Sequence, residues 1–177
     1  MPYASRAGEK LAFALKSFGV NVNNLVCADF GSSTGGFVDC LIQNGATKVY
    51  AIETGYGVLD WKLRNEKRVV VMEKTNAMHI ILPEKVDLIT IDTSWTKLEK
   101  TIPNALKNLK PAGLMIALLK PHYEKGGYVK DSELEEIVEK TIISISSLDI
   151  NILSKIESPL VGSKGGNKEF LLLIKPK

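Results

Sequence analysis

Short apolar runs alternate with amphipathic stretches along the whole chain. A continuous apolar run is typical of a strand that is buried on both faces of a sheet. Apolar residues at helical spacing, such as Leu11, Leu15 and Phe18, indicate an amphipathic helix instead. The pattern predicts strands over 25–30, 48–53, 68–73, 86–92, 114–120, 150–158 and 168–175. It predicts helices over 6–18, 35–45, 58–66, 95–110 and 131–146.

Residues that favour helix ends mark several of these boundaries. Gly19 follows the first helix as a C-cap, because glycine adopts the left-handed conformation at little cost. Pro111 and Gly113 are expected to end the helix over 95–110. Asp131 is expected to be the N-cap of the helix over 131–146, because its carboxylate accepts a hydrogen bond from a first-turn amide.

The order of these elements predicts an α/β fold, in which helices cover a mostly parallel sheet of seven strands. The last two strands are joined by the loop 159–167, which is long enough for a hairpin but too short for a parallel crossover. The last strand is therefore expected to be antiparallel, unlike the strands of a plain dinucleotide-binding Rossmann fold. We expect a single domain over 1–177, whose first 20 residues carry the N-terminal helix.

Composition and charge narrow the function classes. The net charge is +3, but residues 131–140 carry −4 and the rest of the chain +7, which suits one basic face that meets nucleic acid. Cys27 and Cys40 are expected to be buried, reduced thiols, and His79 and His122 lie too far apart in the sequence to suggest a metal site. No apolar run approaches the ~18 residues of a membrane span, and no signal peptide is evident. These features predict a cytoplasmic protein without a membrane partner.

The strongest local signal is a glycine-rich loop between the first strand and the following helix. It consists of Asp29, Phe30, Gly31, Ser32, Ser33, Thr34, Gly35, Gly36 and Phe37. Glycine lets the backbone approach a ligand closely, and the helix N-terminus offers amides to a carboxylate or phosphate. The loop lacks the Gly-Lys-Ser/Thr end of a P-loop and does not match GxGxxG. It suits the methionine part of S-adenosylmethionine, whose ammonium Asp29 would meet directly or through water.

Further polar residues follow other predicted strands. Glu53 ends the second strand, 22 residues beyond Gly31, where an acid accepts hydrogen bonds from both ribose hydroxyls of an adenosine. The alternative for Glu53 is a solvated side chain. Thr75 and Asn76 follow the third strand, where an adenine edge would lie, and Asp92 ends the fourth strand. Since ligands bind at the carboxyl ends of strands in open α/β sheets, we expect these residues to share one site.

Six segments of the sequence resemble the TlyA-type hemolysin/rRNA methyltransferases, which group with the FtsJ-like 2′-O-methyltransferases. They are SRAGEKL, DFGSSTGGFVDCLIQNGA, VYAIETGYGVLDWKLRNEKRVVVMEKTN, DLITIDTSW, LLKPHYEKGG and GSKGGNKEFLLLI, and they cover nearly the whole chain. The block from Asp29 to Asn76 is the most specific, because GYGVLDWKLR is not a general methyltransferase feature. The resemblance implies a Rossmann-like, S-adenosylmethionine-dependent enzyme that methylates ribose 2′-hydroxyls of ribosomal RNA, with rRNA or ribosomal subunits as partners.

The resemblance also implies a catalytic Lys-Asp-Lys-Glu tetrad. Matched by motif, the tetrad falls on Lys10 in the first helix, Asp92 after strand four, Lys120 after strand five and Glu169 in the last strand. Each residue alone has an ordinary explanation as a solvated side chain, but the four contexts together favour a common site.

The chemistry of methyl transfer to a hydroxyl is consistent with this set. A lysine accepts the hydroxyl proton only if its pKa falls from ~10.4 towards the working pH. A second lysine lowers that pKa, whereas neighbouring carboxylates oppose the change and hold the amine in place. We therefore expect Lys120 to accept the proton and Asp92 to orient it, while Lys10 and Glu169 position the ribose.

The sequence departs from the family pattern at several points. The family usually carries an S4-like RNA-binding domain before the segment that corresponds to SRAGEKL, and we expect this chain to lack it. The segment after KPHYE is short, and IDTSW and KPHYE replace the commoner IDVSF and KPQFE. Trp61 and Trp95 are candidates for stacking on bases, with Trp61 alternatively a core residue. Basic residues expected to meet RNA phosphates are Arg6, Lys62, Arg64, Lys125 and Lys164.

Three alternative functions stay open at this point. The first is a module that binds the cofactor or RNA without turnover. The second is a hemolysin-like activity, against which the lack of a spanning or strongly amphipathic apolar segment argues. The third is a small-molecule methyltransferase, against which the charged tetrad argues.

Overall fold

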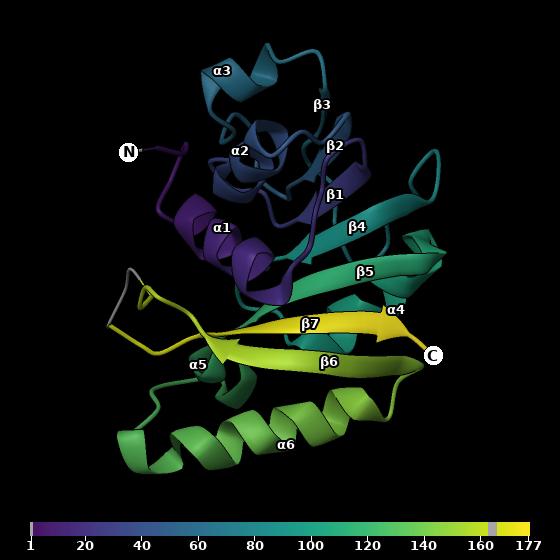
Figure 1. Ribbon diagram of the computed structural model, residues 1–177. Helices are drawn as coiled ribbons and strands as arrows, with labels where there is room; N and C mark the ends of the chain where they lie inside the picture. Colours follow the sequence, from purple (N-terminus) through teal and green to yellow (C-terminus); the bar gives the residue numbers. More distant parts are fainter. Residues whose placement is uncertain (1, 163–165) are drawn as a thin grey trace.

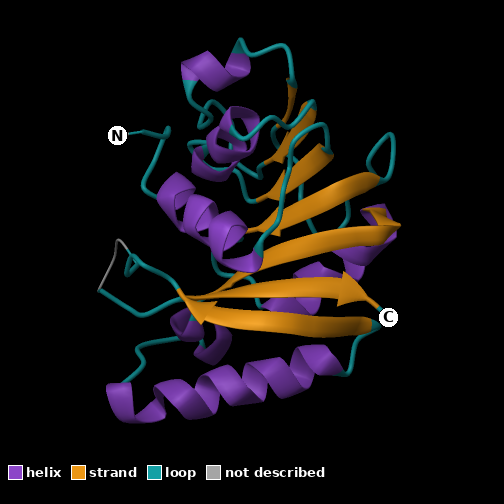
Figure 2. Cartoon of the chain, viewed as in Figure 1, coloured by secondary structure: helices purple, strands orange, loops and turns teal. Residues whose placement is uncertain are grey.

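The computed structural model describes residues 2–162 and 166–177 and contains one seven-stranded sheet with helices on both faces (Figures 1 and 2). The strands are β1 (Val26–Phe30), β2 (Lys48–Ile52), β3 (Val69–Met72), β4 (Val86–Ile91), β5 (Leu109–Leu119), β6 (Ile150–Glu157) and β7 (Phe170–Pro176). The helices are α1 (Ala7–Phe18), α2 (Gly36–Gln43), α3 (Trp61–Arg64), α4 (Leu98–Asn108), α5 (Pro121–Lys125) and α6 (Leu134–Ser146). A 3₁₀ turn, η1 (Asp131–Glu133), precedes α6.

The strand order in the sheet is β3-β2-β1-β4-β5-β7-β6. The first five strands run parallel to one another, and β7 runs antiparallel to both β5 and β6. Because β6 and β7 are consecutive, their hairpin inserts β7 between β5 and β6 at the edge of the sheet (Figure 1). The predicted α/β fold with an antiparallel last strand is therefore confirmed.

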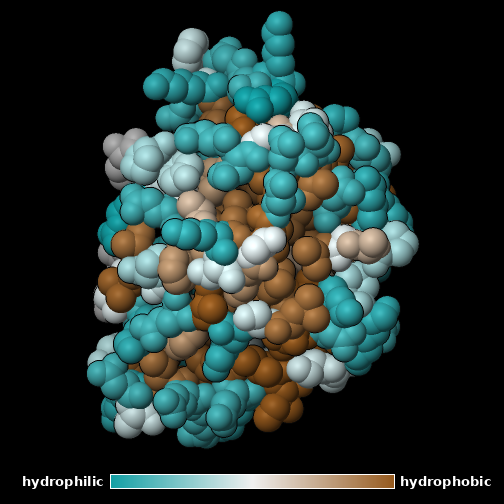
Figure 3. Space-filling model, viewed as in Figure 1, coloured by the Kyte–Doolittle hydropathy of each residue, from teal (hydrophilic) through white to brown (hydrophobic). Residues whose placement is uncertain are grey.

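Two apolar layers hold the helices against the sheet. Alternate side chains of one strand point to opposite faces, so that Cys27 packs with α1 and α2 while its neighbour Ala28 packs with α4 and α6. Both predicted thiols, Cys27 and Cys40, are buried and unpaired. Apolar atoms also gather in the middle of the face seen in Figure 3, with hydrophilic side chains around them. Among the described helices, none is long and apolar enough to cross a membrane.

The helix end at Gly19 agrees with its prediction, because Gly19 has a φ of 66° and its amide donates to Lys16 O. The prediction that Pro111 and Gly113 end a helix is wrong. Helix α4 already ends at Asn108, whose side chain accepts from Leu82 N (2.8 Å) and donates to Ile80 O (3.0 Å). The chain then continues directly into β5.

Pro111 and Gly113 lie inside β5, where the pairing with β4 shifts register between Val86 and Leu88. A proline is tolerated at such an irregularity, because its missing amide hydrogen is not needed by the ladder. Strand β5 is therefore longer at its start than the apolar run alone indicated.

Three further features differ from the sequence expectation. Asp131 is not the N-cap of α6, because η1 intervenes and Glu133 occupies that position. The Glu133 carboxylate organises this turn by accepting from Lys130 N (3.0 Å) and Lys125 Nζ (2.8 Å).

The helix predicted over 58–66 is shorter in the structure, where it consists of the single turn α3. Asp60 caps this turn by accepting from Lys62 N (2.8 Å). Helix α5 was not predicted.

Candidate active site

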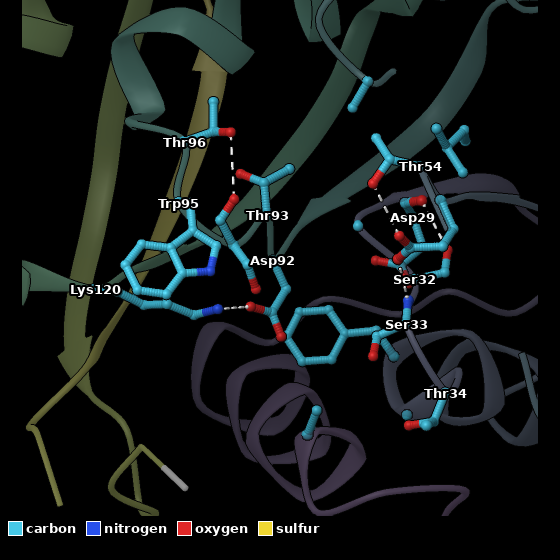
Figure 4. A pocket seen from close by; sticks show the side chains of 18 of the residues that line it. Asp29, Ser32, Ser33, Thr34, Thr54, Asp92, Thr93, Trp95, Thr96 and Lys120 are labelled. Atoms are coloured by element: carbon cyan, nitrogen blue, oxygen red, sulfur yellow. Dashed lines mark hydrogen bonds and ion pairs between the residues drawn. The ribbon is translucent and has the colours of Figure 1, made fainter. Parts of the chain in front are cut away.

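A pocket of about 850 Å³ opens at the carboxyl ends of the parallel strands. Its walls come from α1, the β1–α2 loop, the segments that follow β2, β3, β4 and β5, and the segment before β7. Figure 4 shows side chains of these segments pointing toward one another from opposite sides of the pocket. This is the position at which open α/β sheets bind ligands.

The glycine-rich loop is folded tightly against the neighbouring strands. The amides of Gly31 and Ser32 both donate to Ile52 O, at 3.0 and 2.9 Å. Gly31 has a φ of 93°, and a Cβ there would lie 2.8 Å from Asp92 O. Glycine is therefore needed at this position both for the left-handed backbone and for the close approach of the loop to the end of β4.

Most of the loop lines the pocket. Asp29, Gly31, Ser32, Ser33, Thr34, Gly36 and Phe37 are among the lining residues. The Phe37 side chain, in the first turn of α2, is at the same time buried in the core that α1 and α2 form with the sheet. Gly35 is not among the lining residues; it precedes α2 with a φ of 97° and its amide donates to Ser32 O (2.8 Å).

Asp29 is buried at the floor of the pocket with one carboxylate oxygen unpaired. Its Oδ1 accepts from Thr90 Oγ1 (2.6 Å), whereas Oδ2 has no hydrogen-bond partner within residues 2–162 and 166–177. Burial raises the pKa of Asp29 to about 7; the Thr90 hydrogen bond opposes this shift and the Asp92 charge adds to it. An occluded acceptor that lacks a donor fits a ligand ammonium, since a cation there would satisfy Oδ2 and favour the charged carboxylate.

Glu53 connects the two loops on the other side of the pocket. Its Oε2 accepts from Ser33 N (2.8 Å), and its Oε1 accepts from Gly55 N (2.9 Å) and Thr54 Oγ1 (3.1 Å). The carboxylate is therefore ordered by the protein rather than merely solvated. Because each carboxylate oxygen has two acceptor sites, Oε2 keeps capacity for a ligand hydroxyl.

Thr75 and Asn76 also line the pocket, after β3. Thr75 N donates to Glu53 O (2.9 Å), and Asn76 Oδ1 accepts from Met78 N (2.9 Å). These contacts fix the turn after β3 against the loop that holds Glu53.

The four tetrad residues line this same pocket as two ion pairs. The Lys120 ammonium pairs with Asp92, and the Lys10 ammonium pairs with Glu169. Side-chain exposure is 12 and 18% in the first pair and 10 and 3% in the second, so both pairs are largely shielded from water. Glu169 lies immediately before β7 rather than in the strand. With two lysines and two carboxylates, the set carries no net charge.

His122 and Tyr123, on α5, complete the wall beside Lys120 and were not assigned to the site from the sequence. His122 Nδ1 is buried and, in the described part of the chain, unpartnered. Its pKa is lowered mainly by burial; Glu169 raises it, and Lys120 and Lys10 lower it further. Charges from both ion pairs therefore act on the pKa of this one imidazole.

The two tryptophans occupy different positions. Trp95 lies at the pocket, 84% exposed, with its ring centroid 4.9 Å from that of Tyr123. Its backbone has a φ of 59°, a conformation uncommon for a bulky residue. Trp61 is 74% exposed on α3, so its interpretation as a core residue is wrong.

The basic residues expected at an RNA surface also differ among themselves. Arg6 lines the pocket, and Lys62 is exposed on α3. Arg64 pairs with Glu73, and Lys125 pairs with Glu133, so each already has an acidic partner. Lys164 lies outside the described residues.

Comparison with known proteins identifies the group to which this architecture corresponds. The profile of the FtsJ-like methyltransferases matches residues 3–175. The chain is 40% identical to Hemolysin A of Brachyspira hyodysenteriae, over 96% of this chain and 75% of that protein. It is 34% identical to the 16S/23S rRNA (cytidine-2′-O)-methyltransferase TlyA of Mycobacterium tuberculosis H37Rv, over 97% of this chain and 68% of that protein.

The fold agrees with these relationships. The crystal structure of a candidate hemolysin from Lactococcus lactis matches with a TM-score of 0.92 at 35% identity, covering 98% of this chain and 88% of that one. The resemblance inferred from the sequence motifs is thereby confirmed.

Proposed function

Because the chain belongs to the FtsJ-like methyltransferase family, we propose that it methylates a ribose 2′-hydroxyl of ribosomal RNA with S-adenosylmethionine as the methyl donor. The observation that carries this proposal is the convergence of the Lys120–Asp92 and Lys10–Glu169 pairs on the pocket that also holds the glycine-rich loop. A relative named as an rRNA (cytidine-2′-O)-methyltransferase supports the substrate class.

We assign the donor to the side of the pocket formed by the β1, β2 and β3 loops. Asp29 Oδ2 meets the ammonium, and Glu53 accepts from the ribose hydroxyls. The amides of Gly31, Ser32, Ser33 and Gly35 already donate within the protein, so they are not assigned to the donor carboxylate. Thr75 and Asn76 border the adenine. When bound there, S-adenosylmethionine supplies a sulfonium-activated methyl group, whose transfer to the 2′-oxygen releases a thioether and the hydroxyl proton.

The tetrad handles the hydroxyl and its proton. Lys120 receives the proton on Nζ, and Asp92 holds the amine in place and stabilises the ammonium once it forms. Lys10 and Glu169, buried together at the neighbouring wall, position the ribose. Holding the hydroxyl in line with the methyl group supplies much of the rate, because orientation replaces a bimolecular encounter.

The exposed Trp95 ring at the pocket suits contact with a base of the RNA, since single-stranded bases stack on aromatic side chains. Arg6, in the wall of the same pocket, suits a phosphate contact. Trp95, after β4, would contact the base, whereas Arg6 would contact a phosphate beside the start of α2, because its neighbours Ser5 and Ala7 lie next to Gly36.

Two measurements test the proposal. Titration calorimetry with S-adenosylmethionine tests donor binding, and transfer of a tritiated methyl group to intact ribosomal subunits and to purified rRNA tests turnover and substrate form. We expect binding, transfer to one of the two substrates, and loss of transfer in Lys120→Ala. Lys48→Ala, at a surface pair with Glu84 away from the pocket, is the matched control and stays active. Donor binding without transfer to either substrate would instead support a binding module without turnover.

A further inference from the structure

The ring of Tyr123 contacts three neighbouring residues of the active site. The Lys120 ammonium lies over the ring, with Nζ 5.2 Å from its centroid. The Trp95 ring packs on Tyr123 at 4.9 Å between centroids, and the His122 ring lies at 4.2 Å. Tyr123 therefore contacts both Lys120, the proposed proton acceptor, and the exposed Trp95.

The backbone fixes this arrangement. Helix α5 begins at Pro121, and Tyr123 N donates to Lys120 O (2.9 Å), so the ring and the amine come from one helical turn. The next residue, Glu124, accepts from Leu98 N (2.9 Å) and thereby ties this turn to the start of α4. The position of the ring relative to Lys120 is thus determined by the fold and not only by side-chain packing.

An ammonium over an aromatic face is attracted by the negative charge of the π system. The interaction favours the protonated amine and restricts a long, flexible side chain to one place. Asp92, which follows β4, also restrains the Lys120 side chain through their ion pair. Among the described residues, the other charged or titratable groups that line the pocket are Arg6 and Lys10 at and before α1, Asp29 and Glu53 at the ends of β1 and β2, His122 on α5 and Glu169 before β7.

We propose that Tyr123 is a positioning residue of the methyl transfer, which holds the Lys120 amine at the reacting hydroxyl by cation–π contact. The proposal rests on the proposed function, in which Lys120 receives the proton. Tyr123 itself takes no part in proton transfer. If the Tyr123 ring served only for packing, changing its electron density without changing its shape would have no effect.

The electron distribution of the ring provides the test. Tyr123→Phe keeps the π face, whereas fluorinated phenylalanines placed at position 123 withdraw negative charge from it without changing its shape. Lys120 accepts a proton only when neutral, so activity rises with pH as the amine loses its proton. A weaker π face no longer favours the ammonium, and the ascending limb of the pH–rate profile moves to lower pH.

We expect the midpoint of that limb to coincide in wild type and Tyr123→Phe. It should then fall progressively with each added fluorine, by about half a pH unit to one unit for the trifluorinated ring. Tyr123→Leu should also lower the plateau rate several-fold, because the amine is no longer held, while donor affinity stays unchanged. Equal midpoints across the fluorinated series would overturn the proposal and leave Tyr123 with a packing role alone.

A second readout keeps this inference separate from the proposed function. In protein with ¹³C-labelled lysine, the ε-carbon of Lys120, assigned by its absence in Lys120→Arg, reports its titration by NMR without any substrate. We expect the same progressive shift to lower pH in the fluorinated series. If the wild-type protein transfers no methyl group but this shift is seen, the proposed function fails and the Tyr123–Lys120 contact stands. If methyl transfer occurs but the Lys120 titration does not shift, the proposed function stands and the proposed Tyr123–Lys120 contact fails.

Discussion

Lys10 and Glu169 lie 159 positions apart in the sequence and form a buried ion pair. The pair joins α1 to the segment that precedes β7, so it closes one wall of the pocket. Removing one partner of such a pair leaves an uncompensated charge in a poorly hydrated place. The Lys10–Glu169 pair is therefore expected to contribute both to the stability of the domain and to its proposed chemistry.

Lys10→Met should lower the free energy of unfolding by about 3 kcal/mol, because Glu169 is left buried without its cation. The double variant Lys10→Met/Glu169→Leu should recover most of this loss, since both charges are then removed together. Both variants should lack methyl transfer. Urea denaturation and the tritium assay measure the two effects. A double variant as unstable as the single one would show that the pair is not the cause.

Asp29 should make the stability of the donor-free protein depend on pH. Burial raises the pKa of Asp29 from 3.8 to about 7, so its stabilising contribution is complete below the unfolded value and is lost as pH rises through about 7. Asp29→Asn has no charge to bury and should be more stable than wild type at pH 8, by roughly 2–4 kcal/mol. The difference should shrink as pH falls towards 4. Denaturant midpoints at both pH values measure it, and a difference independent of pH would exclude this explanation.

The same residue should control donor affinity. The ammonium needs an ionised Asp29, so wild-type affinity for S-adenosylmethionine should weaken as pH falls below about 7. Asp29→Asn should bind about 10-fold or more weakly at pH 8, in line with the loss of a charge-assisted hydrogen bond. Calorimetric titrations between pH 6 and 8 measure this, and a wild-type affinity that does not change across that range would contradict the assignment.

Glu53→Gln should weaken donor binding by one to two orders of magnitude, because an amide presents one acceptor oxygen where the carboxylate presents two. An analogue of S-adenosylhomocysteine that lacks both ribose hydroxyls provides the control. This analogue should bind wild type and Glu53→Gln equally. If the substitution weakened binding of the analogue as much as binding of S-adenosylhomocysteine itself, Glu53 would act by ordering Ser33 and Gly55 rather than by contacting the ribose.

Gly31→Ala should affect both the glycine-rich loop and the end of β4, which Asp92 follows. The new Cβ would meet Asp92 O at 2.8 Å and occupy a left-handed backbone position, so the loop and the end of β4 must move apart. We expect weaker donor binding and at least a 100-fold loss of methyl transfer. Gly127→Ala is the matched control, because a Cβ there meets no atom within 4 Å. Near-normal transfer by Gly31→Ala would show that the close approach is not required.

Much of the fold follows from local sequence rules. The pattern of apolar and polar residues located all seven strands, and the short 159–167 loop predicted the antiparallel β7, because both depend on nearby residues. The β5 boundary was missed because Pro111 and Gly113 end helices in general but also fit an irregular strand. Only the pairing of β4 with β5 decides between these outcomes.

The candidate site, like the fold, could be predicted from the sequence only in part. Motifs located Lys10, Asp92, Lys120 and Glu169, but which carboxylate pairs with which lysine depends on the packed fold. Tyr123 was not assigned because its role arises from a ring position set by α5. The departure at KPHYE, where a tyrosine replaces the commoner phenylalanine of KPQFE, marked the position without indicating its contact.

The most direct test of the central claim is to identify the methylated atom. Ribosomal subunits are incubated with S-adenosylmethionine and either wild type or Lys120→Ala, and the rRNA is digested to nucleosides for mass spectrometry. We predict a new 2′-O-methylated nucleoside with wild type, and a yield lower by 100-fold or more with a folded Lys120→Ala. A methyl group on a base, or equal 2′-O-methylation by both proteins, would contradict the account.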